Sequence, residues 1–163
     1  MPRPQRQAAP AIRPAGRHDL SFLQRCAREA YEVYIEAIGK EPAPMLFDFA
    51  AALGTDTIEV MEASARPVGY MRWELRPDCL FLDSIAITRD AQGHGYARHA
   101  FDHLERVARA AHRPAIELYT NEAMVQNLTL YPHLGFDVTG YREEDGYRRV
   151  YFRKELDRLP SND

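Results

Sequence analysis

The chain has 163 residues, a net charge of −3 and 28% charged residues. This length is typical of one domain with one core, and the negative charge argues against nucleic acid or another partner held mainly through phosphates. Cys26 and Cys79 lack metal-ligand spacing, and no apolar run resembles a signal peptide core or could span a bilayer, so we expect a cytoplasmic protein with buried thiols and no membrane partner.

The first third of the chain is predicted to be helical. Apolar residues at helical spacing predict a long first helix over residues 19–38, which Gly39 ends. The segment that follows contains two prolines and breaks this helix. Residues 45–53 then predict one short helix, closed by Gly54.

Three strand-like runs follow, and short turn-prone segments separate them. They cover residues 57–62, 68–75 and 79–87. Because the connections are short, we expect an antiparallel meander.

An amphipathic helix, from Gly95 to about Ala111, connects the run 79–87 to a further strand at 114–120. This connection is too long for a hairpin, so the two strands should be adjacent and parallel in one sheet. The sequence therefore predicts an α/β fold of the α+β type, with a mixed, mostly antiparallel, twisted sheet flanked by helices.

The last third is predicted to contain one helix and a hairpin. Residues 122–134 form the helix, which should kink or end near Pro132 because proline disrupts a helix interior. Strands at 136–142 and 147–156 flank an Asp-Gly turn, which is a good hairpin signal. We expect a single domain over residues 1–163, with its core at about 12–156.

The stretch RDAQGHGYARHA lies where a strand passes into a helix, and Gly93 and Gly95 stand two residues apart in it. A helix start has unpaired N–H groups and partial positive charge, so it can bind an anion if no side chains block the approach. No Gly-Lys-Ser/Thr follows, which excludes a triphosphate-binding P-loop, and a dinucleotide-binding loop would need a third glycine. The alternative is that the glycines only form a tight turn.

The stretch Gln92 to Ala97 resembles the Gln/Arg-x-x-Gly-x-Gly/Ala signature of the GNAT superfamily of acyl-CoA-dependent N-acyltransferases. LDSIAITRD is similar to the strand before that signature, and NLTLYPHLGF is similar to the later helix of the family. The resemblance covers about residues 12–156, and within the superfamily the chain is similar to a subgroup of small bacterial acetyltransferases.

This resemblance implies that the central parallel strands splay apart and that coenzyme A lies along them. Backbone N–H groups of the glycine loop would bind the pyrophosphate, and the strand ending at Ile87 would bind the pantetheine arm. Arg89, Arg98 and His99 are further candidates for phosphate contacts. The implied cofactor residues are Ile85, Ala86, Ile87, Gln92, Gly93, His94, Gly95, Tyr96, Ala97 and Asn127.

Tyr131 occupies the position that matches the general acid of the family, one helical turn after Asn127. The alternative is a core tyrosine with an ordinary hydrogen-bond partner. Asp83 is our candidate general base, or else a carboxylate satisfied by backbone groups at a strand kink. Acetyl-CoA would be the co-substrate, and no metal is implied.

Acceptor recognition is expected from the first helices and the strand hairpins. The candidate substrate-binding residues are Tyr31, Tyr34 and Trp73. Glu32 and Glu36 on the first helix would suit a cationic acceptor.

We therefore expect an N-acetyltransferase that transfers an acetyl group from acetyl-CoA to a primary amine of a small molecule or peptide, by direct attack in a ternary complex. The alternative is a non-catalytic acyl-CoA-binding or sensing module on the same fold. A nucleotide-binding protein of another fold is disfavoured, because the chain has neither a P-loop lysine nor an early βαβ unit. A homodimer is compatible with the sequence.

Overall fold

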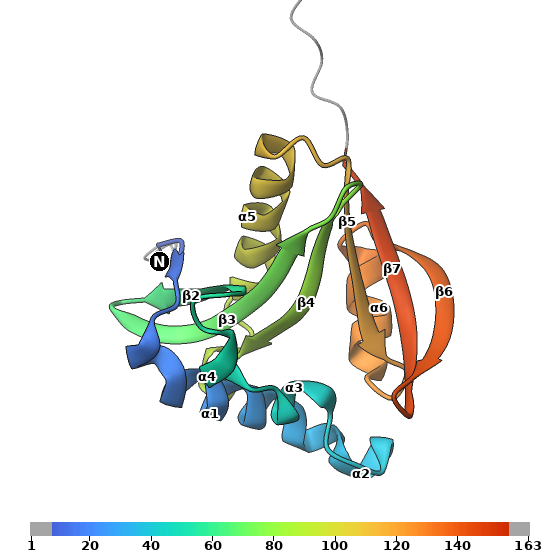
Figure 1. Ribbon diagram of the computed structural model, residues 1–163, viewed down its shortest axis with the longest axis horizontal. Helices are drawn as coiled ribbons and strands as arrows, with labels where there is room; N and C mark the ends of the chain where they lie inside the picture. Colours follow the sequence, from blue (N-terminus) through green and yellow to red (C-terminus); the bar gives the residue numbers. More distant parts are fainter. Residues whose placement is uncertain (1–7, 157–163) are drawn as a thin grey trace, which may run out of the picture.

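The computed structural model describes residues 8–156, and Figure 1 shows one twisted sheet with helices on both faces. The strands follow the order β1-β2-β3-β4-β5-β7-β6, so β7 lies between β5 and β6. Their bounds are β1 (Ala11–Pro14), β2 (Thr57–Ala63), β3 (Arg66–Leu75), β4 (Leu80–Ile87), β5 (Ala115–Asn121), β6 (Asp137–Glu144) and β7 (Tyr147–Glu155).

Only β4 and β5 pair in parallel, while all other neighbouring strands of the described chain are antiparallel. The predicted mixed sheet, the meander and the adjacent parallel pair are therefore confirmed. The helices are α1 (Leu20–Tyr31), α2 (Ile35–Ile38), α3 (Ala43–Leu46), α4 (Phe49–Ala52), α5 (Tyr96–Ala110) and α6 (Val125–His133).

The alternation of side chains along the strands divides the core between the two faces of the sheet. On β3, Met71 packs with Phe101 and Leu104 of α5 in the larger cluster. The preceding residue, Tyr70, packs with Leu23 of α1 in the second cluster. One layer of helices, α5 and α6, therefore covers one face, and α1 with α4 covers part of the other (Figure 1).

The parallel pairing of β4 with β5 is short. It runs only from Leu80↔Ile116 to Leu82↔Leu118, although both strands continue beyond these residues. On its other side β4 pairs Leu82 and Ser84 with consecutive residues of β3, which leaves Asp83 as the extra residue of a β-bulge. Figure 1 shows the two strands separating beyond this point.

Two helix predictions were wrong. The first helix is interrupted by a 3-10 turn at Glu32–Tyr34 before α2, which Gly39 ends as expected. Apolar residues three positions apart fit both helix types, so spacing alone does not separate them. The predicted helix over 45–53 is two single turns, because Asp48 accepts a hydrogen bond from Ala51 N–H at 3.0 Å and so starts α4 as its N-cap.

The predicted ends of the later elements hold. Helix α6 finishes one residue after Pro132. The β6–β7 turn places Asp145 and Gly146 at φ +54° and +78°, which matches the Asp-Gly hairpin prediction. Strand β1 was not predicted, since its Pro14 is unusual in a strand but is acceptable at the edge of a sheet.

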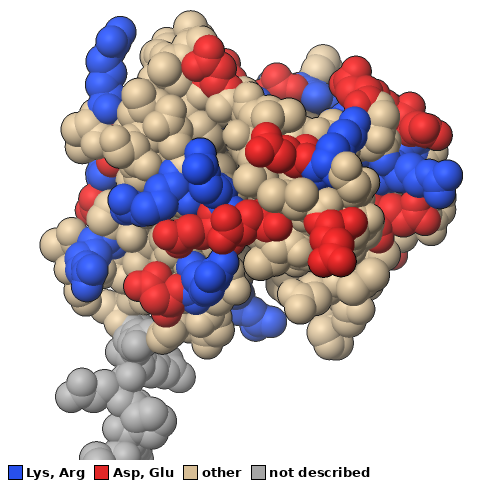
Figure 2. Space-filling model, turned by 90° about the horizontal axis from the view of Figure 1, so that it is seen from below, with Lys and Arg blue, Asp and Glu red and all other residues tan. Residues whose placement is uncertain are grey.

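The surface mixes charges of both signs. In Figure 2, which views the molecule from below Figure 1, acidic and basic side chains lie next to one another. Surface pairs of this kind include Arg89 with Glu32 and Arg76 with Glu74. Within residues 8–156, no helix has the length and apolar character needed to cross a membrane.

Gly69 on β3 provides a test of the sheet packing. A Cβ atom at this position would lie 2.6 Å from the Ala86 carbonyl oxygen of β4 and 2.8 Å from Ile87 Cδ1. We expect Gly69→Ala to lower the free energy of unfolding by about 1–3 kcal/mol, because backbone atoms of β4 must shift.

Gly140→Ala on edge strand β6 is the matched control, since nothing lies within 4 Å of its Cβ position. Its effect should stay within about 0.5 kcal/mol. Urea denaturation of both variants measures the difference, and equal stability of the two would contradict the close packing of β3 on β4.

Candidate active site

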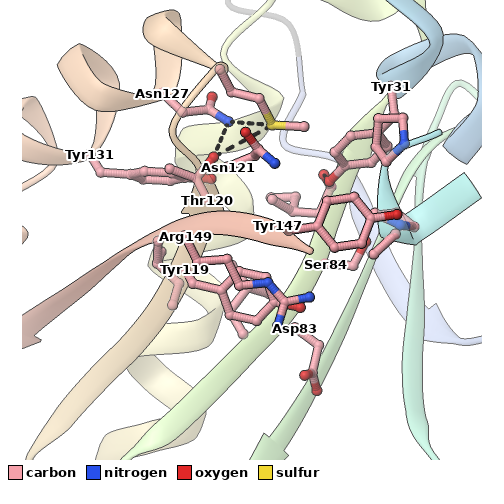
Figure 3. Close-up of a pocket in the computed structure, with 17 residues that line it drawn as sticks. Tyr31, Asp83, Ser84, Tyr119, Thr120, Asn121, Asn127, Tyr131, Tyr147 and Arg149 are labelled. Carbon is pink, nitrogen blue, oxygen red and sulfur yellow. Dashed lines mark hydrogen bonds between the residues drawn. The ribbon is translucent and has the colours of Figure 1, made fainter. Parts of the chain in front are cut away.

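A pocket that is open to solvent occupies the gap between β4 and β5. Figure 3 shows it, with side chains reaching it from α1, the strands and α6. The lining residues are Tyr31, Pro42, Ala43, Pro44, Leu82, Asp83, Ser84, Ile85, Leu118, Tyr119, Thr120, Asn121, Met124, Asn127, Tyr131, Tyr147 and Arg149.

The α6 side of the pocket carries no charged side chain among the lining residues. Asn127 Nδ2 donates a hydrogen bond to Thr120 Oγ1 at 3.0 Å and lies 3.7 Å from Met124 Sδ. These contacts fix the Asn127 amide against β5 (Figure 3). This half of the pocket is therefore largely apolar and has few polar groups, which are held in place.

Tyr131 extends from α6 into the same half of the pocket (Figure 3). Its ring packs against Phe101, Phe136 and Phe152, with centroid separations of 6.0, 5.9 and 5.4 Å. Burial raises the pKa of Tyr131 well above its usual value, so the hydroxyl stays protonated. Within residues 8–156 no protein group makes a hydrogen bond with this hydroxyl, which is available to a ligand.

The opposite half of the pocket, on the α1 face of the sheet, contains charges of both signs. Arg149 on β7 donates from Nη1 to Glu144 Oε2 at 2.9 Å, and its guanidinium carbon lies 4.3 Å from the centre of the Tyr119 ring. Asp83 lies at the bulge of β4. Figure 3 shows both residues on the side of the pocket away from Tyr131.

Asp83 is only 20% exposed, and its Oδ2 lies 3.6 Å from Arg72 Nη1. Burial raises the pKa of Asp83, and the nearby Arg72 charge reduces that rise without cancelling it. Arg72 also approaches Asp56 Oδ2 at 3.6 Å and lies over the Phe47 ring. The Asp83 carboxylate is thus positioned by an arginine but accepts a proton more readily than a surface aspartate.

Residues 40–44, which we call the strap, follow Gly39 at the end of α2 and include the first two residues of α3. The Tyr147 hydroxyl donates to the Glu41 carbonyl oxygen at 2.6 Å. Lys40 Nζ donates to the Asp145 carbonyl oxygen at 3.0 Å and lies over the Tyr147 ring. These contacts attach the strap to the β6–β7 hairpin, and Pro42, Ala43 and Pro44 then form one wall of the pocket.

Tyr31 connects α1 to the separated part of β4. Its hydroxyl donates to the Ile85 carbonyl oxygen at 2.8 Å, and burial raises the pKa of Tyr31 to about 12. Ala86 and Ile87 continue the strand toward the glycine loop, where Gln92 Nε2 donates to the Ile87 carbonyl oxygen at 3.2 Å. The backbone of β4 beyond Leu82 does not pair with β5, and Asp83, Ser84 and Ile85 of this stretch line the pocket.

The glycine loop lies at the end of this strand. Gly93 and Gly95 have φ +82° and +80°, and nothing lies within 4 Å of a Cβ atom at either position. Gly95 is the N-cap of α5, with no side-chain cap for the N–H groups of the first turn, which include those of Tyr96 and Ala97. The loop therefore combines a conformation that favours glycine with an open approach to a helix N-terminus.

Most side chains near this loop already have partners within the protein or point to solvent. His94 Nδ1 lies 3.0 Å from the Ala91 carbonyl oxygen, so its ring bonds to the loop itself. Arg89 pairs with Glu32 at 3.1 Å. Arg98 is exposed and His99 is half-buried on α5. An anion here would be bound mainly by backbone N–H groups.

Some predicted acceptor residues lie outside this pocket. Trp73 faces α5, and its Nε1 donates to Glu59 Oε1 at 2.6 Å. Tyr34 lies in the 3-10 turn after α1 and does not line the pocket, and the same is true of Glu32 and Glu36. Of the predicted acceptor wall, the structure brings only Tyr31 to the pocket.

Sequence inspection missed Tyr119, Tyr147 and Arg149. A usable signal was present in the strand pattern. Along β7, Val150 and Phe152 face the α5–α6 core, so Arg149 and Tyr147 must point to the other face. Two charged or hydroxyl-bearing side chains at alternate positions of a central strand indicate a polar site on that face.

This geometry can hold an extended ligand that carries an anionic group. The anion would lie at the N-terminus of α5, the chain would follow the unpaired backbone of β4, and the reactive end would reach the hydroxyl of Tyr131. A second molecule could enter from the α1 face, beside Asp83 and Arg149. The extended ligand and the second molecule would then meet in the gap between β4 and β5.

The sequence model of the acetyltransferase (GNAT) family matches residues 21–136. No curated protein matches the chain. Among solved structures, the ribosomal-protein-S18-alanine N-acetyltransferase from Escherichia coli is similar with a TM-score of 0.72 and 17% identity, covering 94% of this chain and 97% of its own.

An acetyltransferase from Thermus thermophilus has a TM-score of 0.70 and 21% identity, with coverage of 91% of this chain and 98% of that chain. A GNAT family acetyltransferase from Elizabethkingia anophelis with acetyl-CoA bound has a TM-score of 0.67 and 14% identity, with coverage of 92% and 100%. At these identities the structural similarity concerns the fold.

The environment of Asp83 predicts a pH effect on stability. Because the pKa of Asp83 is raised in the folded chain, the unfolded chain ionises first as the pH increases, and stability falls between the unfolded and folded pKa values. Relative to Asp83→Asn, the wild-type chain should therefore lose free energy of unfolding between about pH 3 and about pH 7.

Urea denaturation at both pH values measures this difference, with Asp102→Asn at an exposed position of α5 as the control. If the wild-type chain instead gained stability relative to Asp83→Asn as the pH rose, the attraction of Arg72 would outweigh burial.

Proposed function

This chain belongs to the GNAT acetyltransferase family, and we propose that it transfers an acetyl group from acetyl-CoA to a primary amine of a small molecule or peptide. The observation that carries the proposal is the uncommitted hydroxyl of Tyr131 in the gap between β4 and β5, opposite a separate polar opening. Two substrates can approach such a site together, which suits direct transfer in a ternary complex.

The donor would lie along the glycine loop and β4. The N–H groups from Gln92 to Ala97 would bind the diphosphate of coenzyme A, where the partial positive charge of α5 favours an anion. The pantetheine amides would hydrogen-bond to the β4 backbone at Ile85 and Ile87, and Asn127 is positioned to contact the same arm. The acetyl-CoA bound to the Elizabethkingia anophelis protein supports acetyl-CoA as the donor.

The acceptor must be a neutral amine when it attacks. Asp83 would take the proton of the ammonium ion, directly or through water, since its raised pKa favours proton uptake. The amine nitrogen then bonds to the thioester carbonyl carbon, and the nitrogen releases a second proton to Asp83 after the first has passed to solvent.

The C–S bond breaks next, and sulfur keeps the electron pair. Tyr131 would give its proton to this thiolate and regain one from solvent. Burial raises the pKa of Tyr131 and so makes it a weaker acid, but the same apolar surroundings also raise the pKa of a thiol, which keeps the pKa difference that governs the transfer close to its value in water. Overall, an ammonium ion and acetyl-CoA give an amide, coenzyme A and one proton.

A non-catalytic acyl-CoA-binding module would share the donor contacts but would release no thiol. Measurement of coenzyme A release over a panel of amines separates the two functions. Thermal stabilisation by acetyl-CoA without thiol release from any amine would favour the binding module.

Substitution of Gly95 tests the diphosphate site. Coenzyme A should raise the Tm of the wild-type chain, because a ligand that binds only the folded state stabilises it. Gly95→Asp should abolish this rise, since it places a negative charge where the diphosphate approaches. Gly95→Asn is the matched control, because asparagine has nearly the same shape and tolerates positive φ equally well.

The asparagine variant should therefore keep more of the Tm rise than the aspartate variant. Differential scanning calorimetry with and without coenzyme A measures both. Equal rises in the aspartate and wild-type chains would place the diphosphate elsewhere.

Tyr131→Phe tests the proton donor, because it removes one oxygen and keeps the ring packing. If the hydroxyl protonates the thiolate, kcat should fall about 10²-fold or more while the affinity for acetyl-CoA changes little. If it is only structural, turnover should persist and stability should change by about 1 kcal/mol.

Steady-state thiol release and calorimetric titration of acetyl-CoA give the two readouts. Tyr141→Phe, on an exposed tyrosine of β6, is the control and should leave kcat unchanged. Full turnover of the Tyr131→Phe chain would remove this residue from the mechanism.

A further inference from the structure

The acceptor half of the pocket contains an arginine with hydrogen-bonding capacity to spare. Arg149 lines the pocket, its side chain is 12% exposed, and only its Nη1 donates to a protein group, at Glu144. Within residues 8–156, the one buried side-chain nitrogen or oxygen without a partner is Arg72 Nε, so the remaining Arg149 N–H groups are reached by solvent. They can therefore donate to a ligand in the pocket.

Arg149 is also rigidly held. Its guanidinium lies over the Tyr119 ring at 4.3 Å and 5.7 Å from the centre of the Tyr147 ring, while Glu144 fixes one end. An arginine that is already ordered loses little side-chain entropy when it binds a ligand. Its planar group suits two parallel hydrogen bonds to a carboxylate.

Glu144 does not remove the need for an anionic ligand. The Tyr151 hydroxyl donates its single proton to this carboxylate and lies 2.9 Å from Oε1 and 2.8 Å from Oε2, and a second arginine, Arg142, lies 3.8 Å away. Two guanidinium groups thus share one carboxylate. The charge left over is positive, and among these three charged residues Arg149 lines the pocket.

The other charged residue of the lining is Asp83, which would take the acceptor amine. An acceptor that binds both Asp83 and Arg149 needs an amine and a carboxylate that are close enough together to fit in one pocket. A peptide places its terminal carboxylate far from its N-terminal amine, and a cationic amine without an acid group leaves Arg149 unused. The sequence suggestion of a cationic acceptor rested on Glu32 and Glu36, which do not line this pocket.

On the basis of the proposed function, we infer that the acceptor is a free amino acid, whose carboxylate binds Arg149 while its amine meets Asp83 and the thioester. Arg149 is then the residue that selects the acceptor. The chemistry of transfer is unchanged, since the carboxylate takes no part in bond formation.

The test compares acceptors that differ only in charge. Each of the common L-amino acids is assayed beside its carboxamide, with thiol release at saturating acetyl-CoA as the readout. The best amino acid should exceed its carboxamide in kcat/KM by about tenfold or more, which is the usual advantage of a hydrogen bond to a charged group. The amide loses its amine proton more easily, so intrinsic reactivity works against this outcome.

Arg149→Gln should reduce the acid-to-amide ratio to about one, mainly through a higher KM for the amino acid. Arg149→Lys keeps the charge but loses the planar pair of donors, and it should give an intermediate ratio. Arg148→Gln is the matched control. Arg148 is an exposed arginine next to Arg149 on β7, it does not line the pocket and it is not one of the two arginines paired with Glu144, so its ratio should equal that of the wild-type chain.

Each outcome decides the inference. An unchanged ratio in the Arg149→Gln chain, or a preference of the wild-type chain for carboxamides, peptides or acid-free amines, would overturn it and leave acetyl transfer intact. If coenzyme A gave no rise in Tm and no amine of any class released thiol, the proposed function itself would fail. A variant with a lower Tm is assayed below its unfolding transition. Both acceptors are measured on the same sample, so the acid-to-amide ratio does not depend on the amount of active protein.

Discussion

Strands β4 and β5 stop pairing after Leu82 and Leu118, and the rest of the site depends on this separation. An extra residue at Asp83 bends β4 through a β-bulge, while its antiparallel pairing with β3 continues to the end of the strand. The gap between the separated strands runs through the sheet, from the face covered by α5 and α6 to the face covered by α1. A continuous ladder here would leave no room for the pocket and would fill the gap with strand pairing.

The separation also has an energetic consequence. Backbone groups that face a gap lose the partners that a sheet normally provides, and they are costly if they stay dry. The chain satisfies one of them internally, through the bond from the Tyr31 hydroxyl to the Ile85 carbonyl oxygen. The proposed pantetheine arm, an amide chain, would supply partners for others, so the same feature that weakens the sheet favours binding of an extended ligand.

Most of the framework followed from the sequence, because local signals determine it. The meander, the parallel crossover and the Asp-Gly hairpin depend on short turns, connection length and apolar alternation, which a single chain displays openly. The division of the predicted helix at residues 45–53 was not visible, because Asp48 acts as a cap only when the chain around Phe47 is extended. Tertiary packing decides between such local alternatives.

The residues of the candidate site also differ in whether the sequence alone could predict them. The proposed donor residues lie in two short motifs, so a resemblance could predict Gly93 and Tyr131 from the sequence. The proposed acceptor residues come from a strap, a bulge and the far strand of a hairpin, which no local pattern connects. Tyr147 and Arg149 are distant from Asp83 in the chain, and only the insertion of β7 beside β5 brings them to one pocket.

The two walls of the pocket differ in whether their residues belong to the hydrophobic core. Leu82, Leu118 and Tyr131 on the donor side belong to the largest core cluster, so changing them disturbs the folding of the whole sheet. The strap and Arg149 on the acceptor side belong to none of the three clusters found in residues 8–156. Substitution of Arg149 should therefore disturb folding less than substitution of Leu82 or Leu118, so the acceptor can change while the acetyl donor stays the same. Proteins with this arrangement can evolve to acetylate different acceptors while they keep the same reaction.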